Sequence, residues 1–231
     1  MANKKNTQAS SMEETLNKSE AFVLKYKKPL LIALVAIIVI VAGAILVKNY
    51  VLEPRAEKAS TILAKGQEYF NAEDFEKALN GDKAKFPGFV AVADEYSSTD
   101  AGNLAKLYAG LSYANLGKLK EAEAQLDGYS ASDDAIVSPA AQAALGNVQA
   151  SLNKLDDAVS SLKKAAKMAD SKAESGHNLS ISPIFLLQAA QILEHQGKTE
   201  DALAIYKSIK SDYLGSAVSR DIDKYIERCT K

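Results

Sequence analysis

The sequence predicts an all-α protein in which a single N-terminal transmembrane helix precedes a stack of helical hairpins. Three observations support this fold class: an uninterrupted apolar run at residues 30–47, one segment pattern that occurs three times further along, and bulky apolar side chains at three- and four-residue steps over residues 101–129. After the apolar run the chain has scarcely any alternating β-branched stretch. At 231 residues, 47% of them apolar, it is long enough for one sizeable domain and an appendage.

Residues 1–28 are predicted to be a cytoplasmic tail. Its first 22 residues are rich in Asn, Ser, Thr, Gln, Lys and Glu, a composition typical of a mobile segment. Lys18, Lys25, Lys27 and Lys28 crowd the start of the apolar run, and fewer net positive charges follow it. The positive-inside rule therefore places the N-terminus in the cytoplasm and residues 48–231 on the other side of the membrane.

Residues 29–47 are predicted to form the transmembrane helix. The run "LLIALVAIIVIVAGAILV" has 18 residues without a charge or a strong helix breaker. At about 1.5 Å per residue it spans roughly 27 Å, close to a hydrocarbon core of about 30 Å. A buried core helix is disfavoured because the run is apolar on all sides. A cleaved signal peptide is the stronger alternative, since Ala42-Gly43-Ala44 has the small-x-small form of a cleavage site, but the apolar run continues past that site and the polar leader is long.

The three-fold pattern reads "LGKLKEAEAQL" at 116–126, "LNKLDDAVSSL" at 152–162 and "QGKTEDALAIY" at 196–206. Each copy predicts a helix, a turn that needs left-handed backbone, and a second helix folded back antiparallel. An alanine lets the two backbones approach, and a bulky residue four positions on fills the wider gap. The turn residues are Gly117, Asn153 and Gly197, the alanines are Ala122, Ala158 and Ala202, and the bulky residues are Leu126, Leu162 and Tyr206.

Two Ser-Pro pairs predict where first helices begin. Ser138-Pro139 and Ser182-Pro183 each place a hydroxyl before a proline, so we expect the serine to cap the helix and the proline to lie in its first turn. Residues 48–100 are predicted to hold a degenerate first repeat and a connecting helix, with Pro54 marking a helix break or start. Residues 101–231 are predicted to hold the repeats and a C-terminal helix that caps the last apolar face.

These hairpins resemble tetratricopeptide repeats, whose period is about 34 residues. The matching small, aromatic, turn and bulky positions are Gly110, Tyr113, Gly117, Ala122 and Leu126 in one unit, Leu145, Gly146, Ala158, Leu162 and Ala165 in the next, Ala190, Gly197, Ala202 and Tyr206 in the third, and Gly66, Tyr69, Phe75 and Ala78 in the degenerate first unit. The basic tail, single span and external repeat domain ending in "YKSIKSDYLGS" are similar to the YfgM-like family, ancillary subunits of the bacterial Sec translocon.

That resemblance implies a protein-binding scaffold in the bacterial inner membrane, with its C-terminal domain in the periplasm. The implied partners are the Sec translocon or a membrane-anchored periplasmic chaperone that assists exported proteins. Two alternatives stay open: an envelope-assembly or cell-division scaffold, and a regulator of a membrane-bound enzyme, which would need a buried polar cluster in the insertion at residues 170–182.

By analogy with tetratricopeptide arrays, the first helix of each unit lines a concave groove for the partner. The expected groove residues are Leu104, Leu107, Leu111, Asn115, Asn147, Ser151, Leu187, Gln191 and His195. Alternatively, Leu104, Leu107 and Leu187 are buried under neighbouring helices and do not line the groove. Lysines that would clamp a free carboxylate are missing from this face, which disfavours capture of a peptide C-terminus.

No chemistry-bearing constellation stands out, so we predict no catalytic residue, cofactor or metal. His177 and His195 lack the short spacing of zinc ligands. Cys229, the single cysteine, excludes an intrachain disulfide and has no histidine beside it in sequence. Acidic residues at the starts of second helices are explained by the helix dipole. Residues 48–231 carry 22 basic and 26 acidic side chains, which gives no electrostatic reason to bind nucleic acid.

Overall fold

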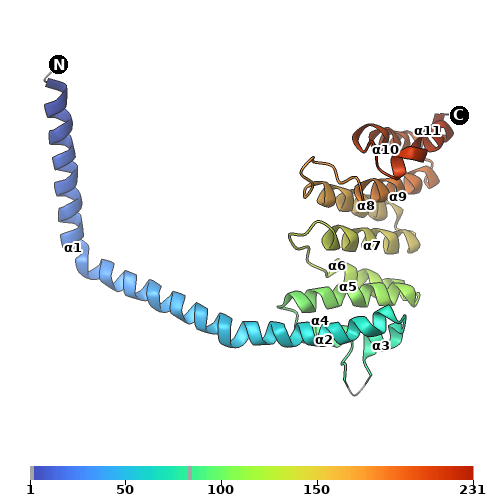
Figure 1. Ribbon diagram of the computed structural model, residues 1–231, viewed down its shortest axis with the longest axis horizontal. Helices are drawn as coiled ribbons and strands as arrows, with labels where there is room; N and C mark the ends of the chain where they lie inside the picture. Colours follow the sequence, from blue (N-terminus) through green and yellow to red (C-terminus); the bar gives the residue numbers. More distant parts are fainter. Residues whose placement is uncertain (1–2, 83–84, 231) are drawn as a thin grey trace. The chain divides into compact units, whose positions relative to one another are not determined.

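The structure is a computed structural model that describes residues 3–82 and 85–230, with side chains described from residue 25 onward (Figure 1). The elements are α1 (Asn3–Val47), the π-helix η1 (Lys48–Leu52), α2 (Glu53–Asn71), α3 (Phe75–Asn80), α4 (Phe89–Glu95), α5 (Asp100–Asn115), α6 (Leu119–Asp127), α7 (Val137–Ser151), α8 (Leu155–Asp170), α9 (Ser182–His195), α10 (Thr199–Asp212), the 3-10 helix η2 (Val218–Asp221) and α11 (Ile222–Thr230). None of the described residues lies in a strand. The all-α prediction is therefore confirmed.

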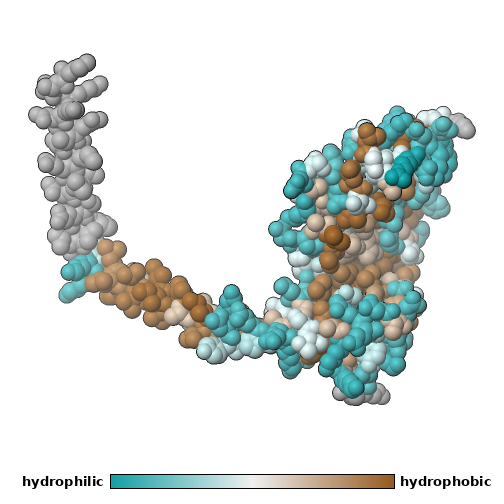
Figure 2. Space-filling model, viewed as in Figure 1, coloured by the Kyte–Doolittle hydropathy of each residue, from teal (hydrophilic) through white to brown (hydrophobic). Residues whose placement is uncertain are grey.

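The chain divides into two compact units, Met1–Pro54 and Arg55–Lys231. In the first unit, α1 carries the apolar run, and every described side chain from residue 25 to residue 50 is exposed. Figure 2 shows this run as a continuous apolar rod. Within the described part of the chain, the helical segment that begins at Lys25 has the length and composition needed to cross a membrane.

The start of α1 lies in the segment of residues 1–22 that was predicted to be a mobile tail. The structure has helix from Asn3 onward. The physical reason is composition, since residues 3–28 contain no glycine or proline and are rich in Ala, Glu, Lys and Leu, which favour helix. Pro54 lies in the first turn of α2 directly after the π-helix η1, and the chain is helical from Lys25 to Asn71, so the proline accompanies a change of helix type and not a break.

The second unit is a stack of antiparallel hairpins. The hairpins α5–α6, α7–α8 and α9–α10 each pack on the next, and α11 packs on α10 (Figure 1). Residues 55–96 precede them as α2, α3 and α4, held by an aromatic cluster in which Phe70 and Phe89 both contact the ring of Tyr108 on α5. This nearest-neighbour packing is the solenoid architecture of helical repeats.

Close approach within the hairpins follows the predicted alanines. Ala122, Ala158 and Ala202 are fully buried. Opposite two of them the first helix carries glycine: a Cβ added to Gly110 would lie 2.6 Å from Leu126 Cγ, and one added to Gly146 would lie 2.9 Å from Leu162 Cγ. These distances are too short for a larger side chain, so each glycine leaves room for the leucine of the second helix.

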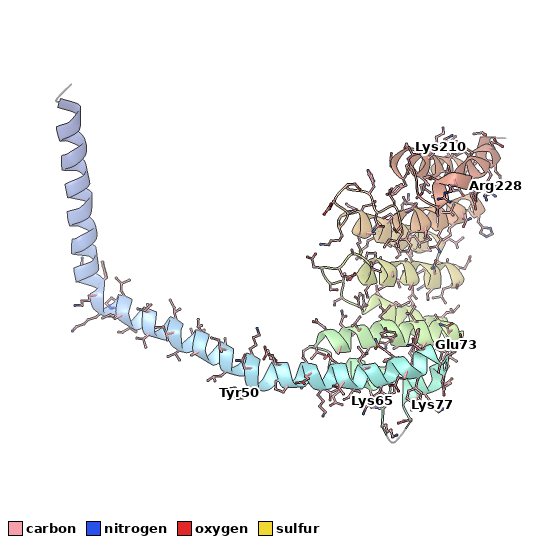
Figure 3. The ribbon with its side chains drawn as sticks, in the orientation of Figure 1. Tyr50, Lys65, Glu73, Lys77, Lys210 and Arg228 are labelled. Atoms are coloured by element: carbon pink, nitrogen blue, oxygen red, sulfur yellow. The ribbon has the colours of Figure 1, made fainter. Side chains whose placement is uncertain are left out.

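The predicted turn residues adopt left-handed backbone, with φ of 72° at Gly117, 61° at Asn153 and 74° at Gly197. In the first hairpin the equivalent position, between α2 and α3, is Glu73 with φ of 59° (Figure 3). A residue with a Cβ is strained there, because left-handed helix conformation costs roughly 1–2 kcal/mol for ordinary L-residues. The first turn is therefore the least favourable of the four.

The start of α7 corrects the predicted serine cap. Asp134 accepts hydrogen bonds from the backbone amides of Ile136 (2.9 Å), Val137 (2.5 Å) and Ser138 (3.1 Å). The Ser138 hydroxyl is buried inside the first turn and donates to Asp134. A carboxylate is the stronger acceptor at a helix N-terminus, so it takes the capping role and the serine supports it.

The start of α9 differs from the prediction in the same way. Asn178 Oδ1 accepts from the amides of Ser180 (3.0 Å) and Ile181 (3.1 Å). The Ser182 hydroxyl instead donates to the carbonyl of Ala166 on α8 (3.0 Å). Ser182 is fully buried, so its bond connects two successive hairpins rather than capping one helix.

Glu73→Gly is expected to raise the free energy of unfolding by up to about 1–2 kcal/mol, because glycine relieves the left-handed strain at an exposed turn. Lys65→Gly is the matched control, since Lys65 is exposed in the middle of α2 (Figure 3) and glycine there costs about 1 kcal/mol. Denaturant unfolding of the full chain in detergent measures both variants. Equal losses of stability would contradict the assigned strain.

Asp134→Asn is expected to destabilise the protein at neutral pH and to have little effect in acid. Burial raises the pKa of Asp134, but hydrogen bonds from Ser138, Ser132 and backbone amides outweigh it and hold the pKa well below its usual range. Stability from such a group is present above the unfolded pKa of about 3.9 and is lost as pH falls through the lower folded value. Thermal unfolding at pH 7 and below pH 4 compares the two chains.

The control for this effect is Asp133→Asn, whose carboxylate is highly exposed and pairs with Lys172. An exposed pair contributes about 0–1 kcal/mol, so this variant is expected to change stability little at either pH. A loss for Asp134→Asn that persists undiminished in acid would contradict the charge-based explanation.

Candidate partner-binding groove

Three of the predicted groove residues come together in one open pocket between α7 and α9. Asn147, Gln191 and His195 line it, and its volume is about 300 Å³. The remaining lining residues are Ala150, Leu155, Gln188 and Ile192. Positions 188, 191, 192 and 195 are three and four residues apart, so they share one face of α9. The small side chain of Ala150 leaves the space open on the α7 side.

The chemistry of this pocket is neutral and rich in amides. Asn147, Gln188 and Gln191 each offer both a donor and an acceptor, and no lysine, arginine or carboxylate is among the lining residues. Leu155 and Ile192 supply apolar surface. Such a lining suits an extended polypeptide, whose backbone presents donors and acceptors in alternation, better than it suits an isolated charged group.

Gln188 carries the clearest sign of a missing partner. Its Oε1 atom is buried and has no hydrogen-bond partner. A buried acceptor without a donor costs about 1–3 kcal/mol. If the Gln188 amide turned towards the pocket, a backbone N–H of a bound segment would supply that donor. Gln188 was not among the predicted groove residues, although helical spacing places it one turn before Gln191 and Ile192 on the same face.

The predicted leucines lie deeper than the amides. Leu107 is buried in the cluster shared by α5, α6 and α7, and Leu111 packs against the same cluster. Leu104 is half-buried between this cluster and the aromatic one, and it lines a separate pocket of about 260 Å³ at the start of α5. Leu187 packs half-buried against the core of the last hairpin. These side chains contribute mainly to packing.

The two remaining predicted residues are exposed at the far ends of their helices. Asn115 donates to the carbonyl of Leu111 (2.9 Å), and Ser151 donates to the carbonyl of Asn147 (3.0 Å). Each hydrogen-bonds within its own helix, so neither joins the α7–α9 pocket. A further pocket of about 300 Å³, lined by α6, α7 and α8 and including Tyr129 and Gln142, was not predicted.

One histidine lies in the loop before α9 and the other at the end of this helix. His177 packs edge-on against the ring of Tyr213, with the ring centroids 5.3 Å apart, whereas His195 ends α9 in the groove. Within the described residues, no group of three or more His, Cys, Asp or Glu side chains is arranged to hold a metal ion. Burial, followed by the charge of Glu194, raises the pKa of Cys229, so its thiol is a weak nucleophile at neutral pH.

The insertion between α8 and α9 holds a small polar cluster. Asp170 accepts from the backbone amide of Asn178 (2.8 Å) and from the hydroxyl of Tyr213 (2.6 Å). Burial and the bond to Asp170 raise the pKa of Tyr213 well above its usual value. Both carboxylate oxygens of Asp170 thus accept hydrogen bonds that hold the loop against α10. This structural role accounts for the polar cluster.

The family model of the tetratricopeptide repeat-like domain matches residues 20–174, about two thirds of the chain. This chain belongs to the tetratricopeptide repeat-like domain family. The hairpin α9–α10 lies beyond the matched residues, yet it repeats the left-handed glycine turn and the buried alanine of the two hairpins before it. The structure thus extends the tetratricopeptide array to its capping helix.

Solved structures show the same fold. Two crystal structures of nearly identical TPR-like repeats from a putative kinesin light chain of Podosopora anserina, one of them a point variant, superpose with a TM-score of 0.56 at 13% sequence identity. The match covers 75% of this chain and 85% or 86% of theirs. No curated protein matches the chain.

Gln188→Met is expected to raise the free energy of unfolding of the unbound protein, because it removes a buried acceptor that lacks a donor while keeping the side-chain length. Gln149→Met is the matched control. Gln149 accepts from the buried hydroxyl of Ser161 (2.8 Å), so its loss is expected to cost about 1–3 kcal/mol. Thermal unfolding without a partner measures both, and destabilisation of similar size in both variants would count against an unpaired Gln188.

Proposed function

We propose that the protein is a membrane-anchored scaffold that binds extended polypeptide segments in the α7–α9 groove on the periplasmic side of a bacterial inner membrane. The tetratricopeptide repeat-like domain makes the chain a protein-binding scaffold. The observation that carries the groove assignment is the unpaired Gln188 oxygen in a neutral pocket already lined by Asn147 and Gln191.

Anchoring is supported by the exposed apolar run in α1. Apolar side chains exposed along a helix of this length are unfavourable in water and favourable in a bilayer. In this proposal residues 29–47 cross the membrane, residues 1–28 stay in the cytoplasm with their lysines, and residues 48–231 face the periplasm, with 48–100 forming the first repeat and its connection and 101–231 the regular repeats and cap.

The partner we propose is the Sec translocon or a membrane-anchored periplasmic chaperone that assists exported proteins. The support is the order of segments, a basic tail, one span and an external repeat domain, which is similar to that of the YfgM-like family. Confinement to one bilayer raises the local concentration of scaffold and partner, so weak contacts in the groove are sufficient. An envelope-assembly or cell-division client is the second candidate, since it would use the same scaffold.

A photo-crosslinking residue at Gln191, in the full chain in native membranes, tests the groove and the partner together. We expect adducts that contain a translocon or chaperone component. We also expect Asn147→Ala to weaken binding roughly 2- to 10-fold, as the loss of one hydrogen bond of about 0.5–1.5 kcal/mol implies, and to lower the adduct yield accordingly.

Lys163, which is exposed on the second helix α8, is the matched control position for the crosslinker. Equal yields from Gln191 and Lys163 would exclude the groove as the binding surface. Adducts at Gln191 that contain only cell-division or envelope-assembly proteins would keep the groove and replace the proposed partner.

A further inference from the structure

The strongly exposed large apolar side chains of the second unit are unevenly placed. Across the described residues 55–82 and 85–230 they are Ile136 (66% exposed), Val137 (40%), Leu179 (44%), Ile184 (43%) and Leu214 (78%). Ile136 and Val137 lie at the start of α7, Leu179 and Ile184 lie at the start of α9, and Leu214 follows the end of α10. All five are therefore in or beside loops that join one hairpin to the next.

Side-chain contacts show that these loops lie along one edge of the array (Figure 1). Asn103 at the start of α5 bonds the backbone of Ser130 after α6 (2.6 and 2.8 Å), and Lys172 after α8 pairs with Asp133 before α7. Tyr213 after α10 reaches Asp170 at the end of α8. We name the edge formed by the loops 128–137, 171–181 and 213–217 the apolar edge.

The opposite edge is polar. It consists of the tight turns within hairpins, and a ladder of ion pairs joins them: Lys118 with Glu76 (3.1 Å), Lys154 with Glu123 (2.6 Å) and Lys198 with Asp156 (2.6 Å). None of the strongly exposed large apolar side chains named above belongs to these turns. Both edges face outward, so surface exposure alone does not explain why one carries apolar side chains.

The apolar edge is also where the chain enters the array. Arg55, the first residue of the second unit, donates to the carbonyl of Glu95 at the end of α4, five residues before α5 begins. Residues 48–54 are all that separates Arg55 from the apolar run in α1. Even fully extended, a connection of this length spans at most about 28 Å. If α1 crosses a bilayer, this edge begins close to its surface.

We propose that the apolar edge rests on the surface of the bilayer that α1 crosses, with these five side chains inserted among the lipids. This inference relies on the membrane anchoring proposed above and not on the groove or its partner. The first helices α2, α5, α7 and α9 all begin at this edge, so an array resting on it holds these helices upright over the lipid. The anchor makes a weak interfacial contact sufficient.

The contact is apolar rather than electrostatic. Exposed acidic residues, among them Asp127, Asp133, Glu174 and Asp212, are interspersed along the apolar edge. Anionic headgroups attract basic surfaces, and this edge is not one. We therefore expect the contact to form on zwitterionic vesicles and to gain nothing from anionic lipid.

Fluorophore labelling of the full chain in vesicles tests the proposal. In a Cys229→Ser background, single cysteines at Leu179 and at Lys120 carry the label, because Lys120 is exposed at the polar edge and the 16 residues of α5 set the two edges about 24 Å apart. With phosphatidylcholine vesicles that contain a headgroup-attached quencher, we expect several-fold stronger quenching at Leu179→Cys than at Lys120→Cys. Adding phosphatidylglycerol should not raise that ratio.

A second variant separates contact from mere nearness to the membrane. Serine at Ile136, Val137, Ile184 and Leu214 removes the other apolar side chains without touching the buried core, and circular dichroism checks the fold. We expect it to lower the quenching at Leu179→Cys towards the Lys120→Cys level. Unchanged quenching would overturn the proposal.

The remaining outcomes are equally decisive. Equal quenching at the two edges overturns the proposal. The Leu179→Cys thiol could also be shielded from a water-soluble thiol reagent in native membranes but not in pure lipid vesicles. That result would assign the edge to a membrane protein and overturn the lipid contact. Failure of the full chain to float with vesicles refutes the anchoring itself, and the edge contact with it, but leaves peptide binding in the groove untouched.

Discussion

Where the two helices of a hairpin cross, a glycine on the first helix leaves room for a leucine of the second, and the rest of the array depends on that close approach. Gly110 lies against Leu126 and Gly146 against Leu162, with no room for a Cβ on either glycine. Hairpins this thin bury one face on the hairpin before and one on the hairpin after. The first helices α5, α7 and α9 therefore follow one another in regular order, and their free faces supply the groove.

The two edges of the array are built from different connections, and this difference divides their roles. A tight turn within a hairpin needs one left-handed residue and leaves little room for variation, as at Gly117 and Asn153. A loop between hairpins must cross from one pair to the next, so it is longer and carries its own supports, such as Asp134 before α7. Longer loops also have room for exposed apolar side chains, and the tight turns have no such room.

The hairpins could be predicted from the sequence because their determinants are local. A left-handed turn residue, an alanine five positions later and a bulky residue four beyond it fix the turn and the crossing, and Gly197, Ala202 and Tyr206 behave as Gly117, Ala122 and Leu126 do. The predicted caps were wrong because Ser138 and Ser182 have the right type and position, but Asp134 and Asn178, four residues upstream, accept from the backbone amides instead. The role of Gln188 in the groove could not be predicted from the sequence, since the burial of its side-chain oxygen depends on how α7 and α9 pack.

The C-terminal helix determines where the groove ends. Arg228 on α11 makes two bonds to the Glu194 carboxylate, which also accepts from the buried Tyr206 hydroxyl at 2.9 Å, and the guanidinium lies 5.0 Å from the ring of Tyr225. Arg228 lowers the pKa of Glu194, so the carboxylate stays ionised and paired. Glu194 therefore binds the C-terminal helix α11, whereas its neighbour His195 lines the pocket. Because α11 packs on α10, it covers the face of the hairpin α9–α10 on which a further hairpin would stack, and the α7–α9 pocket lies next to this covered end of the described array.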